Sequence, residues 1–263
     1  MGPNPTGVPT PAPPGIRDDE AAAVADPKRA LLARGHPGTS MYFADRTSAG
    51  LALGQGLAAR ETSADIVLGL TRGGVPVAFE VAKALQAELD IMVVKKIGAP
   101  FSPELAIGAV CPDGSVVTRS EAVEELGVSR DYVEREITAL SLEARTAEGR
   151  YRGGGEPLGL AGKRVVIVDD GVATGATMEA AIMSARSRGA LRVSVAVPVA
   201  SVYAARALEG VADDFAALEV PPDFFAVGQY YDDFSPVADV EVQALLARAR
   251  QSRSADAAER REG

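Results

Sequence analysis

The sequence is poor in the residues from which most metal sites and hydrolytic triads are built. Its 263 residues include one cysteine, one histidine and no tryptophan. With Cys111 alone no internal disulfide can form, and Cys111 and His36 together are too few for a zinc site of the usual His/Cys kind. A Ser-His-Asp triad would have to use His36, which stands in a Gly/Pro-rich context where we expect a solvated side chain. We expect Cys111 to be inert.

Positive charge and long apolar runs are also scarce. The formal net charge is −9, which disfavours nucleic acid or an anionic membrane surface as a partner. No apolar run approaches the length of a transmembrane helix, and the N-terminus lacks the basic and apolar regions of a signal peptide. With a single cysteine, these absences predict a cytoplasmic protein. A hydrophobic content of 47% suits one soluble domain with a sizeable core.

Composition divides the chain into three parts. Residues 1–38 are rich in Pro, Gly and Ala and are predicted to form a disordered tail, with a short helix over 19–32. Residues 39–247 are predicted to form the folded domain, and the Arg-, Ala-, Ser- and Glu-rich residues 248–263 a second disordered tail. Strands alternate with helices across the middle part. This pattern predicts an α/β domain with a mostly parallel sheet and helices on both faces.

The stretch VVIVDDGVATGAT organises the predicted domain. Its apolar run from Val165 to Val168 is typical of a strand buried on both faces of a parallel sheet. Asp169 and Asp170 end that run, and a loop then leads into a predicted helix. In open α/β sheets, ligands bind where the carboxyl end of a strand meets the start of a helix. We therefore expect a binding site here.

The loop carries the features of a phosphate site. Glycines permit a tight turn, and the N–H groups of the first helical turn, together with threonine hydroxyls, can donate to an anion. Two carboxylates beside a phosphate would repel it unless they bind sugar hydroxyls or a hydrated Mg²⁺, so the stretch predicts a ribose phosphate. A Walker loop would need lysine where Ala176 stands, and GxGxxG is absent. The predicted phosphate-binding residues are Gly171, Val172, Ala173, Thr174, Gly175, Ala176 and Thr177.

A second strand, loop and helix suggest another anion site. The predicted strand Ile66–Leu70 runs into Thr71, Arg72, Gly73 and Gly74, which offer one cationic side chain and exposed backbone N–H groups. The next predicted strand, 91–97, ends with Lys95 and Lys96. Side chains alternate along a strand, so only one of these lysines is expected to face the ligand.

Three further features admit two interpretations each. Residues 98–109 are predicted to form an extended loop that could act as a flexible lid, in which Glu104 is either a lid residue or an exposed acid. Arg46 contacts either a phosphate or only a carboxylate, and the structural role is favoured. Near the C-terminus, Tyr230, Tyr231 and Asp232 belong to an aromatic cluster that forms either a hood stacking on a heteroaromatic acceptor or local core packing.

The stretch VVIVDDGVATGAT resembles the phosphoribosyl diphosphate (PRPP) binding motif of the type I phosphoribosyltransferases. That motif has four apolar residues, two acids, a small residue, two variable residues and TGxT, and every position matches. The RGG loop resembles the pyrophosphate loop of this family, and KKIGAP…ELAIGAV resembles a poorly characterised subgroup of PRPP-binding proteins. The resemblance implies the type I phosphoribosyltransferase fold, with a mostly parallel sheet and a small hood, and homodimers are common among such proteins.

The resemblance also implies a reaction and a role for each motif. A nitrogenous acceptor, expected to be a nucleobase, would displace pyrophosphate from the ribose of PRPP with the help of Mg²⁺. Asp169 and Asp170 would hold ribose hydroxyls or the water ligands of the metal, and Asp170 is also a candidate general base. Residues 171–177 would hold the 5′-phosphate, while Thr71, Arg72, Gly73, Gly74 and Lys95 or Lys96 would hold pyrophosphate, Lys96 being the candidate catalytic lysine.

Two alternatives to the transferase remain open. One is a PRPP- or nucleotide-sensing regulatory protein that binds the ligand without catalysis. The other is hydrolysis or phosphate transfer on another phosphorylated sugar. The sequence contains no recognisable acceptor-specific pattern.

Overall fold

A six-stranded parallel sheet forms the centre of the computed structural model, which describes residues 30–31 and 42–262. The strand order is β1-β9-β8-β7-β2-β3, and neighbouring strands are parallel throughout. The carboxyl ends of these strands therefore lie along one edge. The strands are β1 (Ala30–Leu31), β2 (Ile66–Leu70), β3 (Glu88–Met92), β7 (Arg164–Val168), β8 (Arg192–Val199) and β9 (Asp214–Glu219).

Helices cover both faces of this sheet. On one face lie α1 (Arg46–Ala59), α2 (Gly74–Leu85) and the start of α7 (Asp239–Glu262); on the other lie α5 (Ala176–Ser187) and α6 (Val202–Val211). Strand β7 shows the division, because Val166 and Val168 enter the first core while Val165 and Ile167 enter the second. The predicted α/β architecture, with a parallel sheet covered on both faces, is confirmed.

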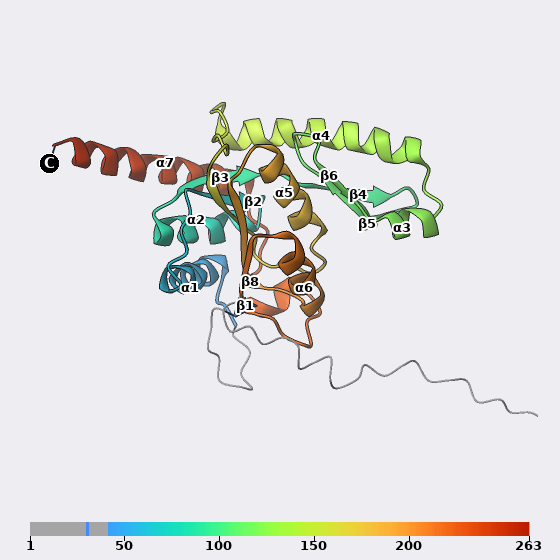
Figure 1. Cartoon of the computed structure of the whole chain (residues 1–263), viewed down its shortest axis with the longest axis horizontal. Coiled ribbons are helices and arrows are strands. Elements are labelled where there is room, and N and C mark those ends of the chain that lie inside the picture. The colour runs from blue at the N-terminus through green and yellow to red at the C-terminus, as the bar shows by residue number, and fades with distance from the viewer. Residues whose placement is uncertain (1–29, 32–41, 263) are drawn as a thin grey trace, which may run out of the picture.

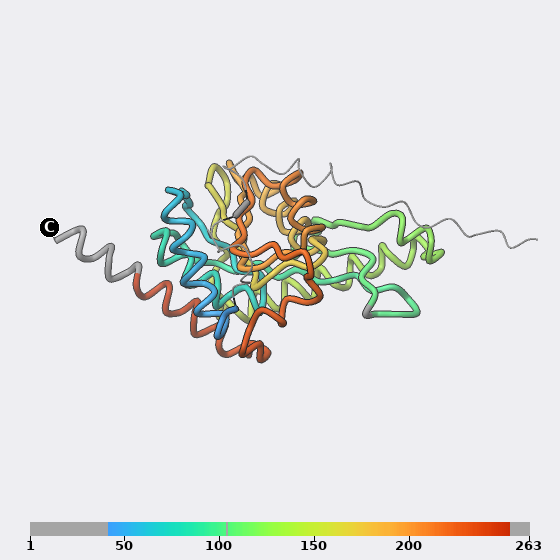
Figure 2. Tube along the Cα trace, turned by 90° about the horizontal axis from the view of Figure 1, so that it is seen from below, coloured from blue at the N-terminus to red at the C-terminus, as the bar shows by residue number. Residues whose placement is uncertain are grey.

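A second sheet projects from the side of the molecule. Its strands, β4 (Lys95–Ala99), β5 (Ser102–Val110) and β6 (Val116–Thr118), are antiparallel and pack with α3 (Ser120–Glu125) and α4 (Arg130–Arg152). We name residues 95–152 the arm; Figures 1 and 2 show it extending beyond the parallel sheet.

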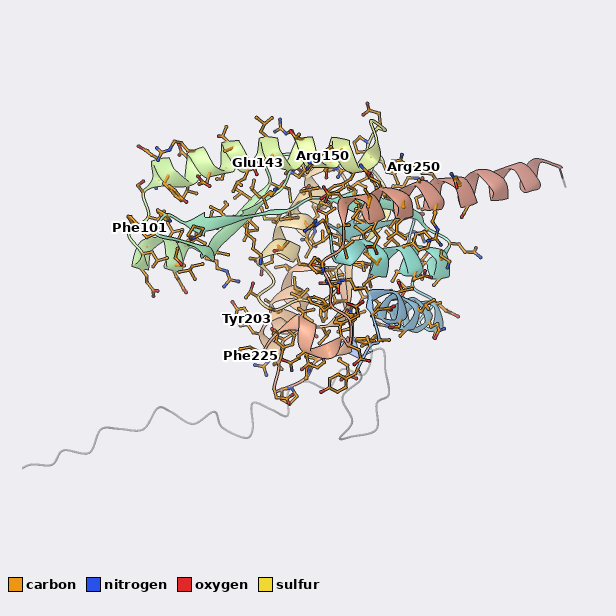
Figure 3. The ribbon with its side chains drawn as sticks, turned by 180° about the vertical axis from the view of Figure 1, so that it is seen from behind. Phe101, Glu143, Arg150, Tyr203, Phe225 and Arg250 are labelled. Carbon is orange, nitrogen blue, oxygen red and sulfur yellow. The ribbon has the colours of Figure 1, made fainter. Side chains whose placement is uncertain are left out.

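The arm corrects two sequence predictions. The predicted strand 91–97 is divided between β3 and β4, because the chain leaves the parallel sheet after Met92. The predicted loop 98–109 is mostly strand, so Glu104 belongs to β5 rather than to a loop. Gly98 makes this pairing possible, since a Cβ there would lie 2.5 Å from the Pro103 carbonyl oxygen. The hairpin tip, with Phe101 97% exposed, lies at the far end of the arm (Figure 3).

Both predicted tails differ from expectation where the structure describes them. Residues 30–31, inside the helix predicted over 19–32, form β1 and pair with β9; residues 19–29 and 32 of that prediction lie outside the described residues. At the other end, helix α7 continues through residues 248–262 (Figure 1). Its buried Val242 and Leu246 anchor the first turns, and the Ala-, Arg- and Glu-rich remainder has high helix propensity, which favours propagation.

Among the helices of residues 42–262, none is long and apolar enough to cross a membrane. The lone cysteine is buried at the end of β5. Burial raises the pKa of the Cys111 thiol to about 12, which keeps it protonated near neutral pH, in line with the inert thiol that we predict.

Candidate functional site

The two predicted anion loops meet at the carboxyl edge of the parallel sheet. Strands β2 and β7 are adjacent, with Gly69 opposite Val168, so the residues that follow each strand are neighbours. A Cβ at Gly73 would overlap the Asp170 Oδ2 atom, and one at Gly74 would lie 2.8 Å from the Asp169 Cα. The glycines of the RGG loop are therefore what allows it to lie directly against the acid pair.

The phosphate loop leaves the start of α5 open. Gly175 has a φ of +86°, which glycine adopts readily, and no side chain among the described residues caps the first turn of the helix. The end of β8 and the start of α6 hold the loop in place. The Val172 N–H donates to the Val199 carbonyl at 2.9 Å, and the Ser201 hydroxyl donates to the Ala173 carbonyl at 2.7 Å. Thr174 is exposed. The uncapped amides at this helix start are free to bind an anion.

The pKa values of both acids of the pair, Asp169 and Asp170, are raised. The Asp169 Oδ1 atom accepts from the Asp170 N–H at 2.9 Å, and burial together with the charge of Asp170 raises the pKa of Asp169 well above its usual value. Burial also raises the pKa of Asp170, although the Arg46 guanidinium opposes this rise. The Nε atom of Arg46 donates to the Asp170 Oδ2 atom at 2.8 Å. Of the two interpretations of Arg46, the structure shows contact with a carboxylate.

The two lysines of β4 point to different partners, as their alternation predicts. The Lys95 Nζ atom lies 3.5 Å from the Glu143 Oε2 atom on α4. Lys96 is exposed, and its charge acts on Asp169, where it favours the ionised carboxylate. Both lysines belong to the arm: Lys95 pairs with Glu143, and Lys96 is the one whose charge opposes the rise in the pKa of Asp169.

Arg72 contacts the start of α7. Its side chain is 47% exposed, and its Nη1 atom lies 3.4 Å from the Asp239 Oδ1 atom at the start of α7. The same Asp239 oxygen accepts from the Tyr151 hydroxyl at 3.0 Å. The peptide bond between Thr71 and Arg72 is cis, and the Thr71 N–H donates to the Met92 carbonyl.

The aromatic cluster behaves as core rather than as an exposed hood. Tyr230 is 1% exposed and Tyr231 is 7% exposed, so neither ring can stack on an acceptor in this conformation. The Tyr231 hydroxyl donates to the Asp170 carbonyl at 2.6 Å, and the exposed Asp232 holds the Phe43 carbonyl through its backbone N–H. The core-packing interpretation is the one that the structure supports. A ring that stays accessible in this segment is that of Phe225, which is 91% exposed (Figure 3).

Sequence reasoning missed Arg119. This residue follows β6, and its Nη2 atom donates to the Thr174 carbonyl at 3.1 Å, which brings a cation from the arm to the phosphate loop. The two residues are 55 positions apart, and nothing in the local sequence around Arg119 marks it as a ligand-binding residue. Only the docking of β6 beside α5 reveals the contact.

Comparisons with known proteins agree with this geometry. The model of the phosphoribosyl transferase domain family matches residues 48–235. The Mycobacterium tuberculosis protein named "Putative phosphoribosyl transferase Rv0571c" is 47% identical over 212 residues, covering 80% of this chain and 47% of that protein. The crystal structure of TT1426 from Thermus thermophilus is similar with a TM-score of 0.67 and 47% identity, covering 78% of this chain and 98% of that one.

A "Ribose-phosphate pyrophosphokinase" of Sulfurisphaera tokodaii is 32% identical over 167 residues, which cover 61% of this chain and 49% of that protein. The chain thus spans about half the length of the curated relatives that it matches. The family match includes the RGG loop, the acid pair and the phosphate loop. The chain therefore belongs to the phosphoribosyl transferase domain family.

Proposed function

We propose that this chain binds PRPP and transfers its phosphoribosyl group to a nitrogenous acceptor, with release of pyrophosphate. The observation that carries this proposal is the contact between the RGG loop and the acid pair at the edge where α5 begins. A ligand with two phosphate-bearing ends and a sugar diol between them matches this arrangement. Family membership supports the same ligand.

Each part of the site has a role in this proposal. The uncapped start of α5 and the loop 171–177 hold the 5′-phosphate, and the backbone of 71–74 holds the pyrophosphate. Asp169 and Asp170 orient the ribose hydroxyls, while Lys96 and Arg119 add positive charge beside the anion sites. Catalysis would then consist mainly of positioning and of stabilising charge on the leaving group.

The residues at the acid pair fit a Mg²⁺ ion. Carboxylate oxygens are hard ligands, and Mg²⁺ commonly binds through one or two of them while it keeps waters and substrate oxygens. Within the described part of the chain, no group of three or more His, Cys, Asp and Glu side chains could hold a metal, so an ion here would depend on the substrate for most of its ligands. When bound, it would neutralise charge on the pyrophosphate.

The acceptor would approach from the side of residues 223–235, which follow β9. Phe225 offers a free aromatic face there, whereas Tyr230 and Tyr231 do not. A planar heteroaromatic base suits such a ring, so a nucleobase remains the acceptor that we propose. The burial of the two tyrosines favours, as a second candidate, a PRPP- or nucleotide-sensing protein that binds without transferring.

Calorimetric titration of PRPP with and without Mg²⁺ tests the proposal. We expect Mg²⁺-dependent binding that is lost in the double variant Asp169→Asn/Asp170→Asn. The matched control is Asp213→Asn/Asp214→Asn, an adjacent pair at the amino end of β9, on the opposite edge of the sheet, and it should bind normally. No binding by the wild-type protein, or equal binding by the acid-pair variant, would contradict the proposal.

A further inference from the structure

Arg46 occupies a fixed place between the acid pair and the segment after β9. It is the first residue of α1, directly after Asp45, which caps the helix by accepting from the Ser48 N–H at 2.7 Å. The helix itself is pressed against α2, since a Cβ at Gly50 would lie 2.8 Å from the Val77 carbonyl oxygen. The backbone from which the Arg46 side chain extends is thus held on both sides.

The guanidinium of Arg46 contacts two separate parts of the chain. Its Nε atom donates to Asp170 Oδ2 at 2.8 Å, and its Nη1 atom donates to the Ser235 carbonyl at 2.8 Å. Its central carbon also lies 4.0 Å from the centre of the Phe234 ring. The Arg46 side chain is 11% exposed and the Asp170 side chain 13%, so their ion pair is largely shielded from water and is stronger than a surface ion pair.

Two further hydrogen bonds, one of them from a side chain, hold the segment 223–235 beside α1 and the acid pair. The Phe43 N–H donates to the Tyr230 carbonyl at 2.8 Å, and the Tyr231 hydroxyl donates to the Asp170 carbonyl at 2.6 Å. Residues 223–235, the side from which the acceptor would approach, are therefore connected to Asp170 both through Arg46 and through Tyr231. We therefore expect a substitution of Arg46 or Tyr231 to affect both Asp170 and the segment 223–235.

The two aspartates are not equivalent in this arrangement. The Asp170 Oδ2 atom is paired with Arg46 and lies against Gly73, where a Cβ would overlap it. Asp169 has no basic partner within salt-bridge distance among the described residues, and its Oδ1 atom accepts from the Asp170 backbone. Arg46 therefore neutralises Asp170, whereas Asp169 is held by the backbone of Asp170 and by its close contact with Gly74.

We propose that Arg46 is a positioning residue for PRPP binding: it holds the Asp170 carboxylate and the segment 223–235 together, so that the acid pair keeps its place against the RGG loop, where the ribose would lie. This inference rests on the proposed function. It differs from a general structural role because Arg46 acts through the Asp170 carboxylate, and removing either partner should have the same consequence for the ligand.

A double-mutant cycle read out by PRPP–Mg²⁺ calorimetry tests this inference. We expect Arg46→Ala to weaken binding about tenfold with a native-like circular dichroism spectrum, and Arg46→Lys, which keeps the charge but loses the fork geometry, to weaken it less. In an Asp170→Asn background, Arg46→Ala should weaken PRPP binding by less than a further factor of about two, because the ion pair between Arg46 and Asp170 is already lost. The control is Arg186→Ala on α5, which removes an exposed ion pair with Asp213 and should bind like wild type.

Three results would overturn the inference. If the losses of PRPP affinity caused by Arg46→Ala and by Asp170→Asn multiply in the double variant, the two residues act independently. If Arg46→Ala lowers the melting temperature but leaves the PRPP affinity unchanged, the contact is purely structural. Tighter binding by Arg46→Ala would show that Arg46 competes with the ligand. If Arg46→Ala does not fold, Arg46→Lys alone and combined with Asp170→Asn completes the cycle. Absence of PRPP binding by the wild-type protein would instead refute the proposed function itself.

Discussion

At the scale of single residues, Gly73 shows why the two loops can form one site. The RGG loop and the acid pair follow strands that are far apart in the sequence, and their contact has no room for a side chain at this position. Any other residue must displace either the loop or the Asp170 carboxylate. Composition alone does not reveal this requirement, although the paired glycines of the RGG loop are compatible with it.

Gly73→Ala should therefore impair both stability and ligand binding. The methyl group would overlap Asp170 Oδ2, and overpacking of this kind costs about 1–3 kcal/mol of unfolding free energy. Urea unfolding measures the stability, and PRPP calorimetry measures the displacement of the acid pair.

The control for this prediction is Gly149→Ala on α4, where a Cβ would meet no atom within 4 Å. Removing a helical glycine should stabilise the protein by up to about 1 kcal/mol. Equal effects of the two substitutions would mean that the contact between Gly73 and Asp170 is not tight in solution.

At the scale of elements, β6 and α5 lie side by side and are joined at both ends. At one end Asp113 accepts from the hydroxyls of Ser184 and Ser187 at 2.9 and 2.8 Å, and at the other Arg119 donates to Thr174. The chain from Asp113 to Arg119 spans at most about 20 Å, which is also about the length of the helical path from Thr174 to Ser187. This match in length places the arm beside the phosphate loop.

Asp113→Ala should loosen the arm at neutral pH. Partial desolvation would by itself raise the pKa of Asp113. Hydrogen bonds from the Ser115 N–H and from the Ser187 and Ser184 hydroxyls outweigh this effect, so the pKa is lowered. A lowered pKa means that the ionised form stabilises the fold, and that this contribution is lost as pH falls through the folded-state pKa. Because the side chain is exposed, we expect a loss of about 1 kcal/mol at pH 7.

The pH dependence checks the assignment of this effect. The difference in melting temperature between wild type and Asp113→Ala should be largest near neutral pH and should shrink below about pH 4, where the free aspartate also becomes protonated. A difference that does not change with pH would show that the ionised carboxylate is not what holds the turn.

At the scale of the whole molecule, the predictable features are those carried by contiguous residues. The apolar run Val165–Val168, the acids after it and the TGxT loop form one continuous stretch, and the structure has the strand, the loop and the helix there. The buried sheet and its two helical faces follow from similar local signals. The boundary of the arm cannot be predicted from local signals. Pro and Gly in 98–103 indicate a loop unless the pairing of β4 with β5 is known.

The features that escaped prediction depend on contacts between distant residues. Arg46 and Asp170 are 124 positions apart, and Arg119 and Thr174 are 55 apart, so no window of sequence contains either pair. Tyr230 and Tyr231 likewise pack against the distant Tyr42 and Phe43, which precede α1. Hydrophobic periodicity cannot decide between an exposed and a buried aromatic cluster in a segment without regular structure.

The protein has a formal net charge of −9, but several basic side chains lie near the site. Four basic side chains, those of Arg46, Arg72, Lys96 and Arg119, lie at or beside the loops in an otherwise acidic protein. Arg46 and Arg72 are paired with Asp170 and Asp239, so Lys96 and Arg119 are the basic groups that we expect to attract an anionic ligand to the loops. A small, highly charged sugar phosphate suits this distribution better than an extended polyanionic surface does.

Release of pyrophosphate from PRPP in the presence of Mg²⁺ and a panel of nucleobases is the decisive test of the proposed transfer. We predict release that depends on one base or one class of bases and that is abolished in Asp169→Asn/Asp170→Asn but retained in Asp213→Asn/Asp214→Asn. Tight PRPP binding without release for any base would support the sensing protein instead. Release that is unaffected by loss of the acid pair would contradict the site described above.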